Sequence, residues 1–250
     1  MPSATPLDRN STRATALVIF AKAPVPGQVK TRLCPPLTPD EAATLHGSFV
    51  LDTLERARTA VGKLKLDMDR YLACAPSSGH VFFKIMEERQ RVKLIDQVGD
   101  DLGPRMHHVV ETMFARGYRR TIMIGTDVPT VPLEYFRQAL TLLENCDLTI
   151  GPALDGGYYL IGMNKPIPEL FVDIPWSTDQ VLKLTQEKAA RLGLKMALLE
   201  RWRDVDTLDD LEALIDACNV ETKKPKNERV FSTRTSGVLQ ALAKRLRSRT

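Results

Sequence analysis

The chain reads ALVIFAKAPVPGQVKTRL over residues 16–33, and this stretch decides the fold class. Residues 16–20 form a short, continuous apolar run, which is typical of a strand that is buried on both faces of a sheet. A loop rich in proline and lysine follows. A helix is expected after it, because Thr38 can cap its start, Pro39 suits its first turn, and Glu41 completes a capping box. A buried strand that leads through a loop into a helix predicts a parallel α/β sheet.

The rest of the chain alternates between strand-like and helical segments. Further strands are expected at residues 71–75, 92–95, 121–125, 148–150, 158–162 and 196–199. Helices are expected at residues 81–89, 102–116 and 133–143, from a cap at Ser177 to about residue 192, and from a cap at Thr207 onward. This order predicts an α/β three-layer sandwich with a mostly parallel sheet. We expect a flexible segment at 1–15, one domain at 16–221 and a basic tail at 222–250.

Composition limits the class of protein. Of the 250 residues 43% are hydrophobic and 26% are charged, so the chain can build a core and is not mainly disordered. No apolar run reaches the roughly 18 residues of a membrane-spanning helix, and the first 15 residues lack the apolar part of a secretory signal. We therefore expect a cytoplasmic protein. The four cysteines are too scattered to favour a zinc site or a disulfide framework.

The net charge of +4 is unevenly distributed. Residues 222–250 contain nine basic residues and one acidic residue, so the tail has a charge of +8 and the remaining chain one of −4. The tail can form a basic amphipathic helix, which is one way to bind an anionic surface. It contains a single aromatic residue, Phe231, and no nucleic-acid-binding motif. We expect a solvated or loosely docked tail and no nucleic-acid partner.

The loop after the first strand is the first candidate site, because ligands bind at the carboxyl ends of the strands in open α/β sheets. Lys22, Lys30 and Arg32 lie within eleven residues, on a segment stiffened by two prolines. Such cations suit a diphosphate or a triphosphate. The glycine patterns of a P-loop and of a dinucleotide site are both missing from this sequence. The alternative is a solvated basic loop.

Acidic residues follow two other expected strands. Asp127 lies two residues after the expected strand at 121–125 and is placed to hold a divalent cation that bridges phosphates, or else it caps a turn. Asp204 and Asp206 alternate on an extended stretch, so their side chains point the same way and can complete a metal site. The alternative for Asp206 is to assist the helix that begins beside Thr207.

Three further segments are candidates for contacts with substrates. In DGGYYLIG at residues 155–162, the paired glycines permit a close approach of the backbone, and Asp155 either reaches an acceptor hydroxyl or closes the turn. In PWST at 175–178, backbone amides at a helix start can hold an anion or a sugar, while Trp176 can also be a core residue. QVGDDLG at 97–103 either contacts a base edge or is an ordinary helix start. The four histidines are expected on helix surfaces.

Five motifs occur in a fixed order along the chain. They read FAKAPVPGxxKTRL at 20–33, GTDVP at 125–129, DGGYYLIG at 155–162, PWST at 175–178 and DVDT at 204–207. Over about residues 16–218 they resemble a bacterial family of uncharacterised transferases in the nucleotide-diphospho-sugar transferase superfamily. Its members are often called arsenosugar-biosynthesis glycosyltransferases. The first loop is also similar to that of guanylyltransferases that act on phospholactate. The resemblance implies a GT-A fold, and a nucleotide held with Mg²⁺ or Mn²⁺ over the strand ends.

The motifs and the loops together give a set of expected site residues. The catalytic candidates are Lys30, Asp127 and Asp155. The nucleotide-binding candidates are Ala21, Lys22, Gly27, Lys30, Arg32, Gln97, Gly99 and Asp101. The acceptor-binding candidates are Gly156, Gly157, Tyr158, Trp176 and Ser177, and the metal-binding candidates are Asp127, Asp204 and Asp206.

Two reactions fit these expectations. The first is metal-dependent transfer of a glycosyl group from a nucleotide sugar to a small acceptor, which is how the family is usually described. The second is transfer of a nucleotidyl group from a nucleoside triphosphate to a small phosphorylated acceptor, with release of pyrophosphate. GT-A glycosyltransferases usually have Asp-x-Asp at the end of the central strand, whereas Asp127 is followed by Val128 and Pro129, as in nucleotidyltransferases. Three cations in the first loop also suit a triphosphate.

Overall fold

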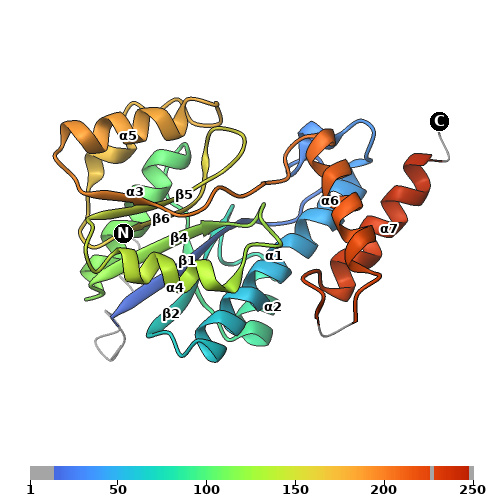
Figure 1. The fold of residues 1–250 in the computed structure, drawn as a ribbon, viewed down its shortest axis with the longest axis horizontal. Coiled ribbons are helices and arrows are strands. Elements are labelled where there is room, and N and C mark those ends of the chain that lie inside the picture. Colours follow the sequence, from blue (N-terminus) through green and yellow to red (C-terminus); the bar gives the residue numbers. More distant parts are fainter. Residues whose placement is uncertain (1–13, 226–227, 248–250) are drawn as a thin grey trace.

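A seven-stranded sheet with helices on both faces forms the body of the protein (Figure 1). The structure is a computed structural model that describes residues 14–225 and 228–247. All but the last two residues of the expected flexible segment 1–15 lie outside this range. Among the described residues, no helix is both long enough and apolar enough to cross a membrane.

The sheet has the strand order β3-β2-β1-β4-β6-β5-β7. Its strands are β1 (Thr15–Lys22), β2 (Met68–Ala75), β3 (Lys93–Asp96), β4 (Arg120–Gly125), β5 (Leu148–Pro152), β6 (Tyr158–Met163) and β7 (Met196–Leu198). Only β6 runs against its neighbours; the other pairs are parallel. The predicted α/β class with a mostly parallel sheet is therefore confirmed.

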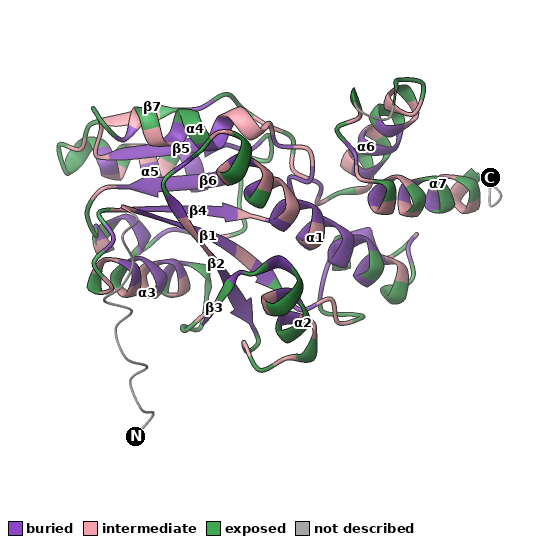
Figure 2. Ribbon diagram, turned by 90° about the horizontal axis from the view of Figure 1, so that it is seen from below, coloured by how far each residue is buried: buried purple, intermediate pink, exposed green. Residues whose placement is uncertain are grey.

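Helices cover the two faces of the sheet in two groups. They are α1 (Pro39–Lys63), α2 (Val81–Gln90), α3 (Leu102–Ala115), α4 (Leu133–Leu142), α5 (Val181–Arg191), α6 (Leu208–Glu221) and α7 (Thr233–Arg247). The first, second and fourth helices share one buried cluster with the sheet, and α3 and α5 share the cluster on the other face. Figure 2 shows that the central strands between them are mostly buried, whereas the edge strands β3 and β7 include exposed residues. This arrangement is the expected three-layer sandwich.

The reversed strand β6 brings a turn to the edge of the sheet where β1 and β4 end. Because β6 is antiparallel to β4, its early residue Leu160 pairs with Ile124 near the end of β4. Strand β5 ends where β6 begins, since Pro152 pairs with Tyr158. The hairpin turn at residues 153–157 therefore lies beside the carboxyl ends of the parallel strands.

Local capping signals are confirmed at two helices and wrong at a third. In α1 the Thr38 hydroxyl accepts a hydrogen bond from the Glu41 amide (3.2 Å), and the Glu41 carboxylate accepts one from the Thr38 amide (2.8 Å). Thr207 caps α6 in the same way. Ser177 does not cap α5, which begins only at Val181. Its backbone has φ +65° within a turn, where the Thr178 hydroxyl donates to the Pro175 carbonyl.

The C-terminal segment is packed against the body, which differs from the expected solvated or loosely docked tail. Leu239 and Leu242 of α7 are buried in a cluster shared with α1 and α6, beside which Figure 2 shows α7. Arg234 lies 2.8 Å from Asp52 and 3.0 Å from Glu55, both on α1. Apolar burial and charge complementarity with α1 thus hold this basic helix in place.

Candidate active site

A cavity of about 510 Å³ opens at the edge of the sheet where β1 and β4 end. Its wall comes from the loop after β1, the end of β4, the hairpin turn at 153–157, the segment at 176–178 and the stretch before α6. This position is where open α/β sheets bind ligands, and the volume lies in the usual range for small-molecule sites. We therefore take this cavity as the candidate active site.

Most of the residues predicted for the site lie in the wall of this cavity. Those in the wall are Ala21, Lys22, Lys30, Arg32, Gln97, Asp127, Asp155, Gly157, Tyr158, Trp176, Ser177, Asp204 and Asp206. The other four predicted residues, all in the described part of the chain, are not among its lining residues; they are Gly27, Gly99, Asp101 and Gly156.

Two of the four residues outside the wall, Asp101 and Gly156, have structural roles. Asp101 accepts a hydrogen bond from the Gly103 amide (2.9 Å) and caps α3, so the segment at 97–103 includes the ordinary helix start that was the alternative. Gly156 has φ +89°, and a Cβ atom there would lie 2.3 Å from the Asp179 carbonyl oxygen. Only glycine fits at this close approach. Gln97 does reach the cavity, but its amide nitrogen is bound to the carbonyls of Ala21 (3.1 Å) and Ala73 (2.8 Å).

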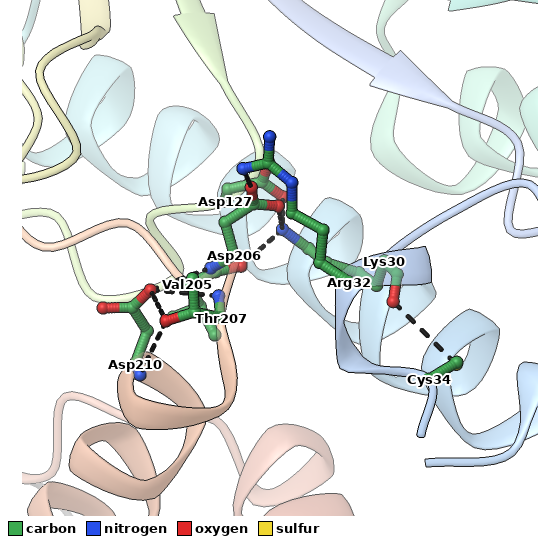
Figure 3. A network of polar contacts seen from close by, with 8 residues as sticks. All are labelled: Lys30, Arg32, Cys34, Asp127, Val205, Asp206, Thr207 and Asp210. Carbon is green, nitrogen blue, oxygen red and sulfur yellow. Dashed lines mark hydrogen bonds and ion pairs between the residues drawn. The ribbon is translucent and has the colours of Figure 1, made fainter. Parts of the chain in front are cut away.

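Lys30 lies at the centre of the polar contacts of the site (Figure 3). Its ammonium group lies 2.6 Å from Asp127 Oδ1 and 3.8 Å from Asp206 Oδ1, and it donates to the Val205 carbonyl at 2.5 Å. Arg32 donates to the other oxygen of Asp206 at 2.7 Å. The loop after β1, the end of β4 and the stretch before α6 therefore meet at one charged cluster.

Lys30 and Arg32 are held very differently. The side chain of Lys30 is 3% exposed, whereas that of Arg32 is 60% exposed. The backbone of Lys30 is left-handed, with φ 50° and ψ 35°. This conformation costs a residue other than glycine about 1–2 kcal/mol, so the surrounding structure must compensate for it. Lys30 is thus a fixed cation, and Arg32 is a cation at the open side of the cavity.

The carboxylates of Asp127 and Asp206 lie beside Lys30 in the cavity. Burial alone raises the pKa of Asp127, but the charge of Lys30 and the hydrogen bond that it donates outweigh this effect and lower it. The side chain of Asp206 contacts Arg32 and Lys30, while Asp210 completes the cap of α6 with Thr207. Asp206 therefore belongs to the cavity rather than to the helix cap.

A second pair of carboxylates forms an acidic side of the cavity. Burial, followed by the charge of Asp155, raises the pKa of Asp204 to about 6. Asp155 accepts a hydrogen bond from the Gly157 amide at 2.8 Å, which fixes its orientation. The cavity is thus polarised: the end of β1 and the loop after it contribute Lys22, Lys30 and Arg32, and other segments contribute these acids.

Two of the three predicted metal ligands lie close together in the cavity. Asp127 and Asp206 converge on one positive charge, the ammonium group of Lys30, so a cation is favourable between them. Within residues 14–225 and 228–247, no three His, Cys, Asp or Glu side chains are grouped so that they can hold a metal ion. Two carboxylates still fit Mg²⁺ or Mn²⁺, because water and phosphate oxygens complete such sites. Asp204 remains a predicted ligand only.

His46 lines the cavity but was not among the predicted site residues. His46 was expected on a helix surface, but it is 6% exposed, and its Nε2 donates to the Lys22 carbonyl at 3.0 Å. Burial lowers the pKa of His46, which therefore favours the neutral imidazole. The sequence did contain a sign that His46 is buried, because it lies next to Leu45 and near Phe49 on the apolar face of α1.

An aromatic pair forms another part of the wall. The rings of Tyr158 and Trp176 meet edge to face, with their centroids 6.3 Å apart. A Cβ atom on Gly103 would lie 2.5 Å from Trp176 Nε1, so the indole packs tightly on the first turn of α3. Trp176 is therefore both a packing residue and a lining residue of the cavity.

Comparison with known proteins identifies the family. The sequence matches DUF2064, described as uncharacterised proteins conserved in bacteria, over residues 59–178. A solved protein from Desulfovibrio desulfuricans G20, described provisionally as a nucleotide-diphospho-sugar transferase, is 34% identical. The match covers 95% of this chain and 98% of that one, with a TM-score of 0.81. The protein is a member of the DUF2064 family. No curated protein matches the chain.

More distant structures share the fold of this DUF2064 protein. A cytidylyltransferase from Leptospira borgpetersenii serovar Hardjo-bovis is 14% identical, with a TM-score of 0.53 over 94% of this chain and 96% of that one. A CMP:2-keto-3-deoxy-manno-octonic acid synthetase in complex with CTP is 13% identical, with a TM-score of 0.53 over 83% and 99%. The match to the 34% identical protein from Desulfovibrio desulfuricans G20 confirms the expected nucleotide-diphospho-sugar transferase type of fold.

Proposed function

We propose that the protein is a transferase that binds a nucleotide-activated donor in this cavity and, with a divalent cation, transfers a glycosyl group to a small acceptor. The observation that carries the proposal is the cluster in which the ammonium group of Lys30 faces the carboxylates of Asp127 and Asp206 at the strand ends. A site for a nucleoside diphosphate needs fixed cations and a place for a metal ion. This cluster supplies both.

The residues of the cavity have distinct roles in this reaction. Lys22, Lys30 and Arg32 neutralise the charge that develops on the departing diphosphate. Asp127 and Asp206 would hold Mg²⁺ or Mn²⁺, which acts as a Lewis acid on the phosphate oxygens when bound. Asp155, oriented by the Gly157 amide, accepts the proton of the acceptor hydroxyl.

Three features favour glycosyl transfer as the reaction. The 34% identical relative is described, provisionally, as a nucleotide-diphospho-sugar transferase. The carboxylates of Asp155 and Asp204 on the acidic side of the cavity would repel a phosphorylated acceptor, but they suit an acceptor that offers hydroxyl groups. The aromatic wall of Tyr158 and Trp176 gives a sugar or a similar ring a surface to pack on.

Nucleotidyl transfer is the second candidate. It is favoured by the three cations of the loop after β1, which suit a triphosphate, and by the fold shared with a synthetase that binds CTP. In this reaction an oxygen of the acceptor attacks the α-phosphorus of a nucleoside triphosphate, the bond to the β-phosphate breaks, and pyrophosphate leaves. Lys30 and Arg32 would then neutralise the pyrophosphate.

A thermal-shift screen tests both candidates. GTP, CTP, ATP, UTP and a set of nucleotide sugars are each added with and without Mn²⁺. A ligand at a hundred times its Kd stabilises the protein by about 2.7 kcal/mol, which raises the Tm of a chain of this size by about 5–10 °C. Asp127→Asn is the test variant. Asp216→Asn, the same exchange at an exposed position of α6, is the matched control.

The outcomes separate the candidates. A metal-dependent shift with nucleotide sugars that is lost in Asp127→Asn and kept in Asp216→Asn supports glycosyl transfer. A shift with one nucleoside triphosphate only, together with pyrophosphate release in the presence of an acceptor, supports nucleotidyl transfer. If no nucleotide or nucleotide sugar shifts the Tm of the unaltered protein, the proposal that this cavity uses a nucleotide donor is wrong.

A further inference from the structure

The segment after Lys30 determines where its side chain points. Residues 31–37 turn back on themselves, with the Leu33 amide bound to the Lys30 carbonyl (3.0 Å) and the Leu37 amide bound to the Leu33 carbonyl (2.9 Å). Leu33 is fully buried and Leu37 is 3% exposed. Because Lys30 has a left-handed backbone, its direction into the cavity depends on how firmly these two leucines are held.

The C-terminal helices cover those leucines. Leu33 and Leu37 belong to one buried cluster with Leu211 of α6 and Leu239 and Leu242 of α7. The cluster joins a segment near the start of the chain to two helices at its end, and it lies outside the two clusters that pack on the sheet. The loop that supplies Lys30 and Arg32 is therefore anchored, through Leu33 and Leu37, in a cluster separate from the two that pack on the sheet.

Arg245 of α7 makes the polar part of this anchor. Its Nε lies 2.5 Å from Glu41 Oε1, and one of its terminal nitrogens donates to the Pro36 carbonyl at 3.2 Å. The Glu41 carboxylate also accepts a hydrogen bond from the Thr38 amide at the start of α1. One guanidinium group thus fixes both the end of the 31–37 segment and the first turn of the helix that follows it. Arg245 is not one of the residues that line the cavity.

We propose that Arg245 is a positioning residue for phosphate binding, and that it acts by holding the 31–37 segment so that Lys30 and Arg32 face the cavity. The proposal rests on the proposed function, because it takes the phosphates of the donor to be bound by Lys30 and Arg32. Without Arg245, the Pro36 carbonyl and the Glu41 carboxylate lose a charged partner. Residues 31–37 then gain conformational freedom, which is lost again when a phosphate binds. The affinity for phosphate therefore falls although no contact with the ligand is removed.

Calorimetric titration of the full chain with inorganic pyrophosphate, at one fixed concentration of Mg²⁺, tests this proposal. Pyrophosphate contains the diphosphate that both classes of donor share, so the result does not depend on the base or the sugar. The test variant is Arg245→Gln. Its matched control is Lys244→Gln, which removes the same charge from the next residue of α7, where the side chain is exposed. Lys30→Met removes a proposed ligand of the phosphate itself.

We expect Arg245→Gln to raise the Kd for pyrophosphate at least fivefold, Lys244→Gln to leave it within twofold, and Lys30→Met to raise it at least tenfold. An unchanged Kd in Arg245→Gln beside a raised one in Lys30→Met overturns this inference and leaves the proposed function standing. An unchanged Kd in Lys30→Met overturns both, because the loop then does not bind the phosphates.

Hydrogen exchange separates positioning from a general loss of stability. Faster exchange at the Leu33 and Leu37 amides of Arg245→Gln, with unchanged exchange at Ile122 in the centre of the sheet, supports a local effect. Equal acceleration at all three amides overturns the proposal. If Arg245→Gln does not fold, Arg245→Lys replaces it, since it keeps the charge opposite Glu41 but has a shorter reach to the Pro36 carbonyl. The proposal is then overturned if Arg245→Lys leaves both hydrogen exchange at the Leu33 and Leu37 amides and the Kd for pyrophosphate unchanged.

Discussion

Replacing Asp204 by asparagine should stabilise the protein at neutral and alkaline pH. Burial and the charge of Asp155 raise the pKa of Asp204 from 3.8 to about 6, so the folded protein binds this proton more tightly than the unfolded chain does. Ionising the carboxyl group therefore costs stability. For the unaltered protein, this group lowers the free energy of unfolding as the pH rises from about 4 to about 6.

The magnitude follows from the same two values. The difference between 3.8 and about 6 corresponds to at most about 3 kcal/mol of stability lost above pH 6, and solvent screening of this partly exposed carboxyl group reduces that loss. Asparagine has nearly the same shape and carries no charge, so Asp204→Asn should recover about 1–3 kcal/mol at pH 8. For a chain of this length, this gain raises the Tm by about 2–12 °C. At about pH 4, where Asp204 is protonated in the folded protein, the gain should shrink markedly.

The assay is thermal unfolding followed by circular dichroism from about pH 4 to pH 8, with EDTA present so that no divalent cation compensates the charge. Asp216→Asn on the exposed face of α6 is the matched control and should change stability by less than about 0.5 kcal/mol at every pH. A variant of Asp204 that is no more stable than the unaltered protein at pH 8, or that is equally stabilised at both ends of the range, would refute the reasoning.

Two further predictions concern the packing around the site. Gly156→Ala should lower the free energy of unfolding in urea by about 3 kcal/mol, because the residue has φ +89° and the new Cβ atom would lie 2.3 Å from the Asp179 carbonyl oxygen. The control Gly193→Ala, at φ +65° with open space around the new Cβ atom, should lower it by about 1 kcal/mol. Equal losses in the two variants would contradict the argument. Arg234→Gln should cost about 2 kcal/mol at pH 7, because it removes a cation that lies 2.8 Å from the buried Asp52 carboxylate. Lys244→Gln in the same assay should change little, and a similarly small effect of Arg234→Gln would show that Asp52 needs no cation.

The parts of the fold that depend on neighbouring residues were predictable from the sequence. The buried run at residues 16–20 and the caps at Thr38 and Thr207 are set by side chains within a few positions of one another. Asp127 could be placed in the cavity because it lies two residues after a buried parallel strand. Ser177 had a similar local pattern and was wrong, because a turn made by Thr178 delays the start of α5.

The contacts that depend on distant residues were not predictable. Arg32 meets Asp206 across 174 positions of the chain, and Arg234 meets Asp52 across 182, so no local spacing predicts either pair. The basic tail illustrates the limit. Its charge indicated a solvated segment, but the acids that neutralise part of it lie on α1, and only the folded chain brings them together.

The antiparallel strand β6 has a consequence for how relatives of this protein can diverge. The turn at 153–157 belongs to a hairpin, and the pairing of Leu160 with Ile124 fixes β6 independently of the length of that turn. Insertions there can reshape one end of the cavity without moving a crossover helix. The loop after β1 cannot change in length so freely, because Leu33 and Leu37 are buried against α6 and α7. We expect relatives with other acceptors to vary in the hairpin and to retain the loop, so that one end of the site diversifies while the other stays the same.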